Sequence, residues 1–369
     1  MKNIAVFFGG QSVEHDVSII TGVMTANCID KEKFSVYPIY VDRSGKWFTG
    51  EALLDLDGYK NLQVKNLIPV ALTGGDNTLY RIKKNKLKEI CKIYVAVNCM
   101  HGGGGEDGSL YGLLSFCNIP VCSAGVLPSA IAMDKNITKL VMNGAGIKCL
   151  KSCVIKDQSD CKKIADKLGF PLIVKPNLLG SSIGVGRAND LDGLKRCVKY
   201  ALGFDKTAVI EPCLENFIEI NCAIYRDKDG ILRVSECERP VGRSEILTFA
   251  DKYEGGKRIF PADVSKNISD KIKQTTKKVY ELLDFSGVIR IDYFVLNGEI
   301  YLNEINSVPG SLAYYLFGDT LKSFEEMLTE LIMASERRYL QKNSLKKEYC
   351  SGILGSCVGK GAKKGVKRL

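Results

Sequence analysis

The chain opens with a continuous apolar segment, residues 4–8, which ends at two glycines. A short apolar run without polar alternation is typical of a strand that is buried on both faces, as in a parallel sheet. Similar runs follow at residues 34–41 and 93–98, and segments of helical character separate them. This alternation predicts a layered α/β domain with a parallel sheet over residues 1–123.

The rest of the body is predicted to form two smaller units. Residues 124–205 are expected to contain one helix at 129–142, followed by strands and two further helices. Residues 206–335 have a more α+β character, with strands, a polar loop, a long helix and a hairpin whose turn is Asn297-Gly298. An Asn-Gly pair between two apolar runs is a strong hairpin signal.

Charge is distributed unevenly along the chain. The formal net charge is +10, and residues 336–369 alone hold ten Lys or Arg against two Asp or Glu. The body is therefore nearly neutral, which argues against a nucleic-acid-binding protein, because such a protein needs a basic face of its own. The tail follows a last predicted helix at 321–337 and ends in a Gly/Lys-rich stretch, so it is predicted to be disordered.

The 14 cysteines are scattered, with no CxxC pair and no Cys/His cluster at zinc spacing. Several lie inside apolar runs, where a free cysteine behaves as a small buried hydrophobe. No stretch reaches the ~18 apolar residues of a membrane span, and the N-terminal apolar run is too short for a signal peptide. We therefore expect a reduced, soluble, cytoplasmic protein with no membrane partner.

The predicted hairpin carries the most informative set of polar side chains. Arg290 and Asp292 alternate on its first strand, and Glu304 and Asn306 alternate on its second. The turn places Asp292 close to Glu304, and carboxylates that face each other across strands destabilise a sheet. A divalent cation removes this repulsion, since Mg²⁺ takes oxygen ligands from carboxylates and from substrate phosphates. The hairpin therefore predicts a metal site, and the alternative is a polar sheet face bridged by Arg290.

Two glycine-rich loops follow predicted strands of the first domain. The first contains Glu14, an acid that can bind an ammonium group, although Asp16 or Ser18 could instead make this segment a helix cap. The second, residues 101–108, begins with His101 and matches GxGxxG only formally. Its acids, Glu106 and Asp107, would repel the pyrophosphate of a dinucleotide, so we do not expect a dinucleotide site. We expect these acids to lie at the start of a helix, with Glu106 or His101 reaching a neighbouring site.

Two later loops suit a phosphate ligand. Lys175 ends a predicted buried strand and is followed by a Gly/Ser-rich loop, residues 177–186. Glycine lets the backbone approach a phosphate and lysine supplies a point charge, whereas the alternative is a simple hairpin turn. A long polar loop, about 242–260, contains Asp-Lys-Tyr at 251–253. Such a loop is either a lid that excludes water or an ordinary solvated loop.

Taken together and in order, these segments resemble the D-alanine–D-alanine ligase family, which has the ATP-grasp fold. The resemblance implies a three-domain ATP-grasp architecture with an N-terminal α/β substrate domain. It also implies a reaction in which ATP phosphorylates the carboxylate of one D-alanine and the amine of a second attacks the acyl phosphate, giving a dipeptide for peptidoglycan precursors. The segments that carry the resemblance are 9–18, 101–108, 129–135, 174–184, 251–253, 260–262 and 290–310.

The resemblance further implies roles for single residues and a homodimeric state. Seven residues match ATP-binding positions, with an acid on the adenine side and an acid at the ribose: Lys135, Lys175, Gly180, Ser182, Glu211, Glu219 and Lys252. Three match ligands of Mg²⁺ or Mn²⁺: Asp292, Glu304 and Asn306. Five match positions that hold the ammonium of the first substrate or stabilise the oxyanion: Glu14, Ser181, Tyr253, Arg290 and Gly310. Three match further substrate positions: His101, Tyr315 and Leu316.

The segment after Gly310 departs from the family pattern. The family has a Thr two residues and a Ser five residues after this glycine, and the Ser binds the carboxylate of the second substrate. Here those positions are Leu312 and Tyr315; a phenol still donates a hydrogen bond, but it is bulkier. The alternatives are therefore a ligase that joins D-alanine to D-serine, D-lactate or another acceptor, and a non-catalytic nucleotide-binding module. Arg290 argues against the non-catalytic module, because a protein that only binds ATP needs no arginine to stabilise an oxyanion.

Overall fold

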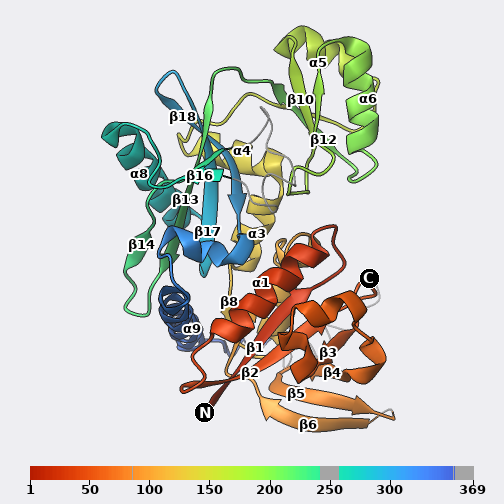
Figure 1. Cartoon of the computed structure of the whole chain (residues 1–369), viewed down its shortest axis with the longest axis vertical. Coiled ribbons are helices and arrows are strands. Elements are labelled where there is room, and N and C mark those ends of the chain that lie inside the picture. The colour runs from red at the N-terminus through yellow and green to blue at the C-terminus, as the bar shows by residue number, and fades with distance from the viewer. Residues whose placement is uncertain (85, 242–256, 352, 354–369) are drawn as a thin grey trace.

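The structure is a computed structural model that describes residues 1–84, 86–241, 257–351 and 353. Within these residues the chain forms three larger sheets and one two-stranded ribbon. In Figure 1 the N-terminal sheet lies at the bottom, the central sheet at the top right, and the C-terminal sheet to the left between them. The cysteines in the described ranges are free thiols. This mixed α/β arrangement confirms the predicted fold class.

The N-terminal sheet has eight strands in the order β6-β5-β4-β3-β2-β1-β7-β8. Strands β2, β1, β7 and β8 are parallel, as the apolar runs predict. Strands β3 to β6 extend the sheet by antiparallel pairing, which the sequence did not reveal because β6 is mostly exposed and lacks an apolar run. The sheet is therefore mixed rather than wholly parallel. The strands are β1 (Lys2–Gly9), β2 (Phe34–Val41), β3 (Trp47–Thr49), β4 (Ile68–Thr73), β5 (Asp76–Lys83), β6 (Lys86–Lys92), β7 (Val95–Asn98) and β8 (Val121–Cys122).

Helix α9 (Leu321–Asn343) comes last among the long elements, yet it packs against β7, β8 and α1 of the N-terminal unit. Its Phe324 lies in the same hydrophobic core as Val95. The helix begins where the Thr320 hydroxyl accepts a hydrogen bond from the backbone N–H of Ser323. It extends beyond its predicted end, so the first residues of the segment predicted to be disordered are helical. The other helices of this unit are α1 (His15–Cys28), α2 (Ser109–Phe116), η1 (Glu51–Leu54), η2 (Asp57–Asn61), η3 (Val64–Asn66) and η4 (Gly103–Gly105).

The central sheet has four antiparallel strands in the order β11-β10-β12-β9. Helices α5 and α6 lie on one side of it (Figure 1), and Leu194 and Val198 of α6 share a buried core with Leu172 and Val174 of β10. Strand β12 was predicted to open the third unit, but its backbone pairs with β10 and β9, so it completes the central sheet. The division of the chain at residues 123, 205 and 335 stays a prediction, and this pairing favours a later second boundary. The elements are β9 (Cys153–Ile155), α5 (Cys161–Leu168), β10 (Leu172–Pro176), β11 (Gly186–Ala188), α6 (Leu191–Ala201) and β12 (Ala208–Pro212).

The C-terminal sheet has the order β14-β13-β17-β18, and helices α3, α4 and α8 pack against it. The helix predicted at 129–142 is in fact two helices, because Asp134 is extended (φ −88°, ψ 103°) and its Oδ1 caps α4 by accepting from the N–H of Ile137 at 2.9 Å. The end of the loop predicted at 242–260 contains a short strand that pairs with β15. The elements are α3 (Val126–Met133), α4 (Lys135–Gly144), β13 (Ile218–Arg226), β14 (Leu232–Val234), β15 (Arg239–Val241), β16 (Lys257–Ile259), α8 (Lys266–Leu282), β17 (Val288–Leu296), β18 (Glu299–Asn306) and η5 (Gly310–Leu316).

The predicted hairpin is confirmed as β17 and β18. Asn297 and Gly298 both have positive φ, 51° and 77°, as a tight hairpin turn requires. The register pairs Asp292 with Glu304, and a register shift directly follows Asp292. The two carboxylates that the sequence placed near each other are therefore direct cross-strand neighbours.

Candidate active site

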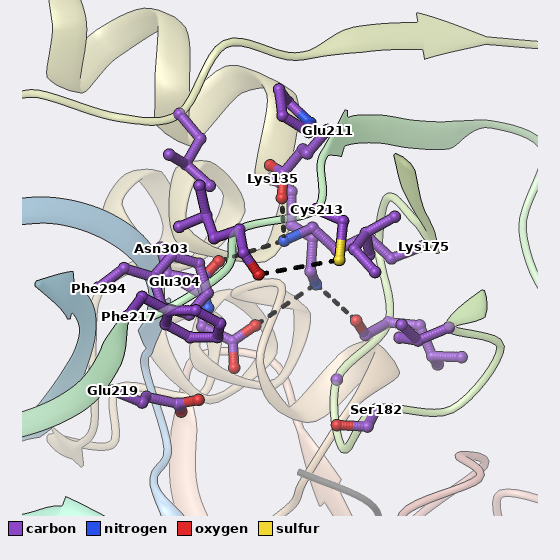
Figure 2. A pocket seen from close by; sticks show the side chains of 17 residues that line it. Lys135, Lys175, Ser182, Glu211, Cys213, Phe217, Glu219, Phe294, Asn303 and Glu304 are labelled. Carbon is purple, nitrogen blue, oxygen red and sulfur yellow. Dashed lines mark hydrogen bonds and ion pairs between the residues drawn. The ribbon is translucent and has the colours of Figure 1, made fainter. Parts of the chain in front are cut away.

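A pocket opens between the central and C-terminal sheets (Figure 2). It holds about 870 Å³ of empty space, its mouth included. One wall has a strongly apolar part, where the rings of Phe217 and Phe294 meet edge to face with centroids 4.9 Å apart. Six of the seven residues predicted to bind ATP line this pocket: Lys135, Lys175, Gly180, Ser182, Glu211 and Glu219. The seventh, Lys252, lies outside the described residues, as does Tyr253.

Two buried lysines supply positive charge to the pocket. Lys175 Nζ lies 2.8 Å from Glu211 Oε2 and donates to Asn303 Oδ1 at 3.2 Å. Lys135 Nζ donates to a backbone carbonyl of the neighbouring loop and lies 3.9 Å from Glu304 Oε2. Burial lowers the pKa of Lys135, although the carboxylate of Glu304 opposes the shift. In Figure 2 these side chains gather together. Such an arrangement is suited to an anionic ligand.

The carboxylate of Glu211 is held between two ammonium groups. Besides Lys175, it has Lys139 Nζ 2.5 Å from its other oxygen. Burial by itself would raise the pKa of Glu211, but the two lysines outweigh it and lower this pKa to about 2. Both carboxylate oxygens thus lie at ion-pair distance from a lysine, and the predicted adenine-side role of Glu211 stays a prediction. Glu219 lies apart from this group in Figure 2, which leaves room for its predicted place at the ribose.

The loop after Lys175 is both a hairpin connection and a wall of the pocket. It joins β10 to β11, which pair antiparallel, so the hairpin alternative is correct as a description of topology. Ser181 and Ser182 adopt φ values of 53° and 56°, a left-handed conformation uncommon for residues with a side chain. This backbone sends the Ser181 hydroxyl out of the central unit to the N-terminal loop, where it donates to Glu14.

Glu14 lies at the meeting point of two units. Its Oε1 accepts from Ser181, and within the described residues its buried Oε2 has no hydrogen-bond partner. Burial, reinforced by the nearby charge of Glu106, raises the pKa of Glu14. A buried carboxylate with an unused oxygen is suited to an ammonium group. The alternative that Asp16 or Ser18 caps the helix is wrong, since α1 begins at His15 and both residues lie inside it.

His101 is buried beside Glu14. Its Nε2 lies 2.9 Å from the Thr21 hydroxyl, and its Nδ1 lies 3.9 Å from Glu106 Oε1. The other oxygen of Glu106 accepts from the N–H of Gly102 at 3.1 Å. The loop of residues 101–108 therefore faces Glu14 with an acid and a histidine, as the sequence suggested.

Asp292 and Arg290 form a two-point ion pair on β17. Arg290 donates from Nε to Asp292 Oδ1 at 2.7 Å and from Nη2 to Oδ2 at 2.9 Å. Asn306 Nδ2 donates to the same carboxylate at 3.1 Å, and Asp292 is only 1% exposed. The arginine bridge, first offered as the alternative to a metal site, is therefore present, and it explains how the apo sheet tolerates Asp292 opposite Glu304.

The same side chains fit a divalent cation. Asp292, Glu304 and Asn306 offer carboxylate and carboxamide oxygens, which are the donors that Mg²⁺ and Mn²⁺ prefer. Among the described residues no group of three His, Cys, Asp or Glu side chains is placed to hold a metal. Two carboxylates are nevertheless sufficient for an Mg²⁺ site that completes its shell with water and nucleotide phosphates. The metal assignment of these three residues stays a prediction.

The turn after Gly310 closes the site on the N-terminal side. Ser311 to Ala313 have φ values of 52°, 51° and 51°, and the N–H of Ser311 donates to the Thr21 hydroxyl at 3.1 Å. The Tyr315 hydroxyl accepts from Arg290 Nη1 at 3.3 Å, so Tyr315 does lie beside the predicted oxyanion arginine. Leu316 is 2% exposed and belongs to the core shared with α9, so its side chain is not available to a substrate.

Four side chains of this region were not singled out from the sequence: Thr21, Lys139, Arg258 and Asn303. The signal for Lys139 was its position four residues after Lys135, on the same face of a helix. Arg258 gave no local signal; its guanidinium lies 5.2 Å from the centroid of the Tyr315 ring and pairs with the buried Glu238 at 3.2 Å. Pairing of β15 with β16 brings it there, and a polar loop sequence does not foretell that pairing.

Two family models match the chain. The model described as "D-ala D-ala ligase N-terminus" matches residues 3–124, and that described as "D-ala D-ala ligase C-terminus" matches residues 145–333. Together they span most of the body.

The chain belongs to the D-alanine–D-alanine ligase family.

Curated members of this family match over nearly their whole length. The D-alanine–D-alanine ligase of Thermosipho melanesiensis is 34% identical over 373 residues, covering 98% of this chain and all of the relative. That of Geobacillus kaustophilus is 32% identical over 361 residues, covering 93% of this chain and 96% of the relative. The family resemblance noted in the motifs is thereby confirmed.

Solved structures agree with the assignment to this family. The enzyme of Helicobacter pylori superposes with a TM-score of 0.75 at 30% identity, covering 89% of this chain and 98% of that one. The VanG D-Ala:D-Ser ligase of Enterococcus faecalis superposes with a TM-score of 0.77 at 29% identity, covering 90% and 99%. No helix in the described ranges of this ligase-family chain is long and apolar enough to cross a membrane.

Proposed function

We propose that this chain is an ATP-dependent D-alanine–D-alanine ligase that makes the D-Ala-D-Ala dipeptide for peptidoglycan precursors through a D-alanyl phosphate. The observation that carries the proposal is the meeting of three units at one place. Ser181 of the central unit donates to Glu14 of the N-terminal unit, and Lys135 lies 3.9 Å from Glu304 of the C-terminal hairpin. This arrangement supports one shared site in which a nucleotide phosphate and a substrate ammonium would lie near the hairpin carboxylates.

The residues divide into groups by task. Lys135 and Lys175 would bind the ATP phosphates, and the loop at Gly180 and Ser182 would cover them. Glu14 and Ser181 would hold the ammonium of the first D-alanine. Arg290 and the N–H of Gly310 would stabilise the oxyanion that forms when the amine attacks the acyl phosphate. The remaining assignments rest on the family motifs: Glu211, Glu219, Lys252, Tyr253, His101 and Tyr315.

We infer that a divalent cation, Mg²⁺ or Mn²⁺, is held by Asp292, Glu304 and Asn306. When bound, such a cation neutralises charge on the phosphates during phosphoryl transfer. Arg290 would then exchange part of its contact with Asp292 for the developing oxyanion, using the Nη1 that donates to the Tyr315 hydroxyl. The Mg²⁺ dependence of turnover tests this inference.

We further propose that the enzyme acts in the cytoplasm, where ATP is supplied, on small-molecule substrates and as a homodimer. These statements rest on the family resemblance. Light scattering coupled to size-exclusion chromatography tests the dimer, which would elute near twice the chain mass of 40.6 kDa.

Phosphate release is the decisive measurement for the function. Purified protein, ATP and Mg²⁺ would be incubated with D-alanine alone, then with D-alanine plus D-serine or D-lactate, and the products identified by mass. Release with D-alanine alone, with the dipeptide as product, is the expected result, in line with the curated relatives. Release only with a second acceptor would make the chain a ligase of that acceptor, as the VanG D-Ala:D-Ser ligase is for D-serine. No release with any acceptor would favour the non-catalytic module.

A further inference from the structure

Lys139 is a buried cation behind the nucleotide pocket. It lies on α4 four residues after Lys135, but it does not line the pocket. Its side chain is 3% exposed, and its Nζ lies 2.5 Å from Glu211 Oε1. In the described part of the chain, Glu211 is the one carboxylate at ion-pair distance from it. None of the roles proposed above for ATP or substrate binding involves Lys139.

Glu211 connects Lys139 to the pocket. Its carboxylate has one ammonium on each oxygen: Lys139 on the hidden side and Lys175, at 2.8 Å, on the pocket side. Of these three side chains, Lys175 is the most exposed, at 10%. Lys139, Glu211 and Lys175 together carry a net charge of +1. Because Lys175 is the more exposed of the two lysines and lines the pocket, the pocket side of this group is positive.

A buried carboxylate must keep a partner when a ligand arrives. If Lys175 turned toward a phosphate and Glu211 had no second cation, an unpaired carboxylate would be left in the interior, which is strongly unfavourable. The phosphate and Glu211 would then compete for one lysine. Because Lys139 stays on Glu211, Lys175 can leave it at little cost.

We propose that Lys139 is a positioning residue for phosphate recognition: it keeps a positive charge beside Glu211 and thereby makes the charge of Lys175 available to the nucleotide phosphates. This rests on the proposed function only in taking the pocket ligand to be ATP. Lys139 itself touches neither the nucleotide nor the reacting atoms. A purely structural ion pair would instead affect stability without changing how strongly phosphates are preferred.

The test separates the phosphate contribution from the rest of nucleotide binding. Dissociation constants for ADP and adenosine would be measured by calorimetry for the full-length parent, Lys139→Gln, and the double variant Lys139→Gln/Glu211→Gln. The measured quantity is the ratio of the adenosine constant to the ADP constant. Glutamine keeps an amide donor near Glu211 but removes the charge, and the double variant also removes the carboxylate, so no buried anion then competes with the phosphate for Lys175.

In Lys139→Gln the ratio should fall about ten- to a hundred-fold, the range of a charge-assisted hydrogen bond. In the double variant it should return to within about three-fold of the parent, because nothing then retains Lys175. With ATP as substrate, Lys139→Gln should raise KM more than it lowers kcat. An unchanged ratio in Lys139→Gln, or no recovery in the double variant, overturns the proposal.

Two further outcomes are a variant that does not fold and a parent that is inactive. If Lys139→Gln does not fold, as judged by circular dichroism, the double variant decides: a parental ratio supports the proposal, and a ratio more than about five-fold lower overturns it. If the parent binds ADP but makes no dipeptide, the ligase function fails while the phosphate proposal is still tested by the ratios. A parent that binds neither ADP nor ATP overturns both.

Discussion

The hydroxyl of Tyr315 accepts a hydrogen bond from Nη1 of Arg290 at 3.3 Å. The family places a small hydroxyl residue at this position, and here a phenol reaches the arginine that is proposed to stabilise the oxyanion. Burial raises the pKa of Tyr315, opposed by the charge of Arg290, so the phenol stays protonated at neutral pH. Tyr315, which the family motif assigns to the acceptor, therefore contacts the arginine that is proposed to stabilise the oxyanion.

Tyr315→Ser should change the kinetics of the acceptor and leave the KM for ATP nearly unchanged. We expect a change of about ten- to a hundred-fold in kcat/KM for the acceptor, the size of a contact with a charged group. Tyr315→Phe is the matched control, since it keeps the ring under Arg258 and removes only the hydroxyl. Steady-state kinetics with D-alanine, D-serine and D-lactate measure both. If Tyr315→Ser stayed within about two-fold of the parent for every acceptor, Tyr315 would not line the acceptor subsite.

Glu304→Gln should raise the Mg²⁺ concentration needed for half-maximal turnover by at least about ten-fold, because one charged oxygen ligand is lost. Glu299→Gln, an exposed position on the same strand that pairs with Lys148, is the control and should behave like the parent. The measurement is phosphate release as a function of Mg²⁺. Parental Mg²⁺ dependence in Glu304→Gln would remove this residue from the metal site.

Asp292→Ala should be far less stable than Glu304→Gln. Removing Asp292 leaves the guanidinium of Arg290, itself mostly buried, without its two-point partner, and breaking a buried pair costs about 3–5 kcal/mol. Glu304 Oε2 instead lies 3.9 Å from Lys135 Nζ, and glutamine keeps the shape of the side chain, so the amide variant should unfold closer to the parental urea midpoint. Equal midpoints for the two variants would contradict this interpretation of the ion pair.

Glu14→Gln should stabilise the ligand-free protein at neutral and alkaline pH while abolishing turnover. Burial and Glu106 raise the pKa of Glu14 above its ordinary 4.5, so the folded state binds the proton more tightly than the unfolded state. Stability therefore falls as the pH rises from about 4.5 through the raised folded pKa, and the full penalty remains above it. We expect a gain on the order of 1 kcal/mol at pH 8 that disappears at pH 4.

Melting temperatures of parent and variant between pH 4 and pH 8 measure this effect. Asp16→Asn is the matched control, because Asp16 lies two residues after Glu14, in the first turn of α1, and its side chain is 80% exposed. It should show no pH-dependent gain. A lower melting temperature of Glu14→Gln at pH 8 would show that the Ser181 contact outweighs the burial of the charge.

Truncation after Ser344 should leave turnover and melting temperature unchanged, since helix α9 is then complete. Truncation after Ser335 removes Arg338, which forms an ion pair with Asp284, and Arg337, which donates to the backbone carbonyl of Lys228. We expect that shorter chain to melt several degrees lower. A large loss of kcat on truncation after Ser344 would show that the tail contributes to the site.

Local pattern was enough to predict the hairpin and its chemistry. Asn297-Gly298 between two apolar runs fixes the register near the turn, where Tyr293 pairs with Leu302, but it is the register shift after Asp292 that puts this residue opposite Glu304. The strand at residues 4–8 and the position of Lys175 at a strand end followed in the same way. The prediction of one helix at 129–142 was wrong, because the chain breaks at Asp134. An aspartate is compatible with the interior of a helix and with the cap of a following helix, and only packing on the C-terminal sheet selected the cap.

The sequence by itself therefore determined the fold class, the hairpin and the residue types needed to bind a phosphate and a cation, because these depend on periodicity and on neighbours a few positions apart. Only the tertiary structure decided that Ser181 reaches Glu14, that Lys139 and Lys175 share Glu211, and that Arg258 lies over Tyr315. Each of these contacts joins elements from different sheets or distant strands. Their geometry depends on how the sheets and strands pack together, and no local pattern encodes that packing.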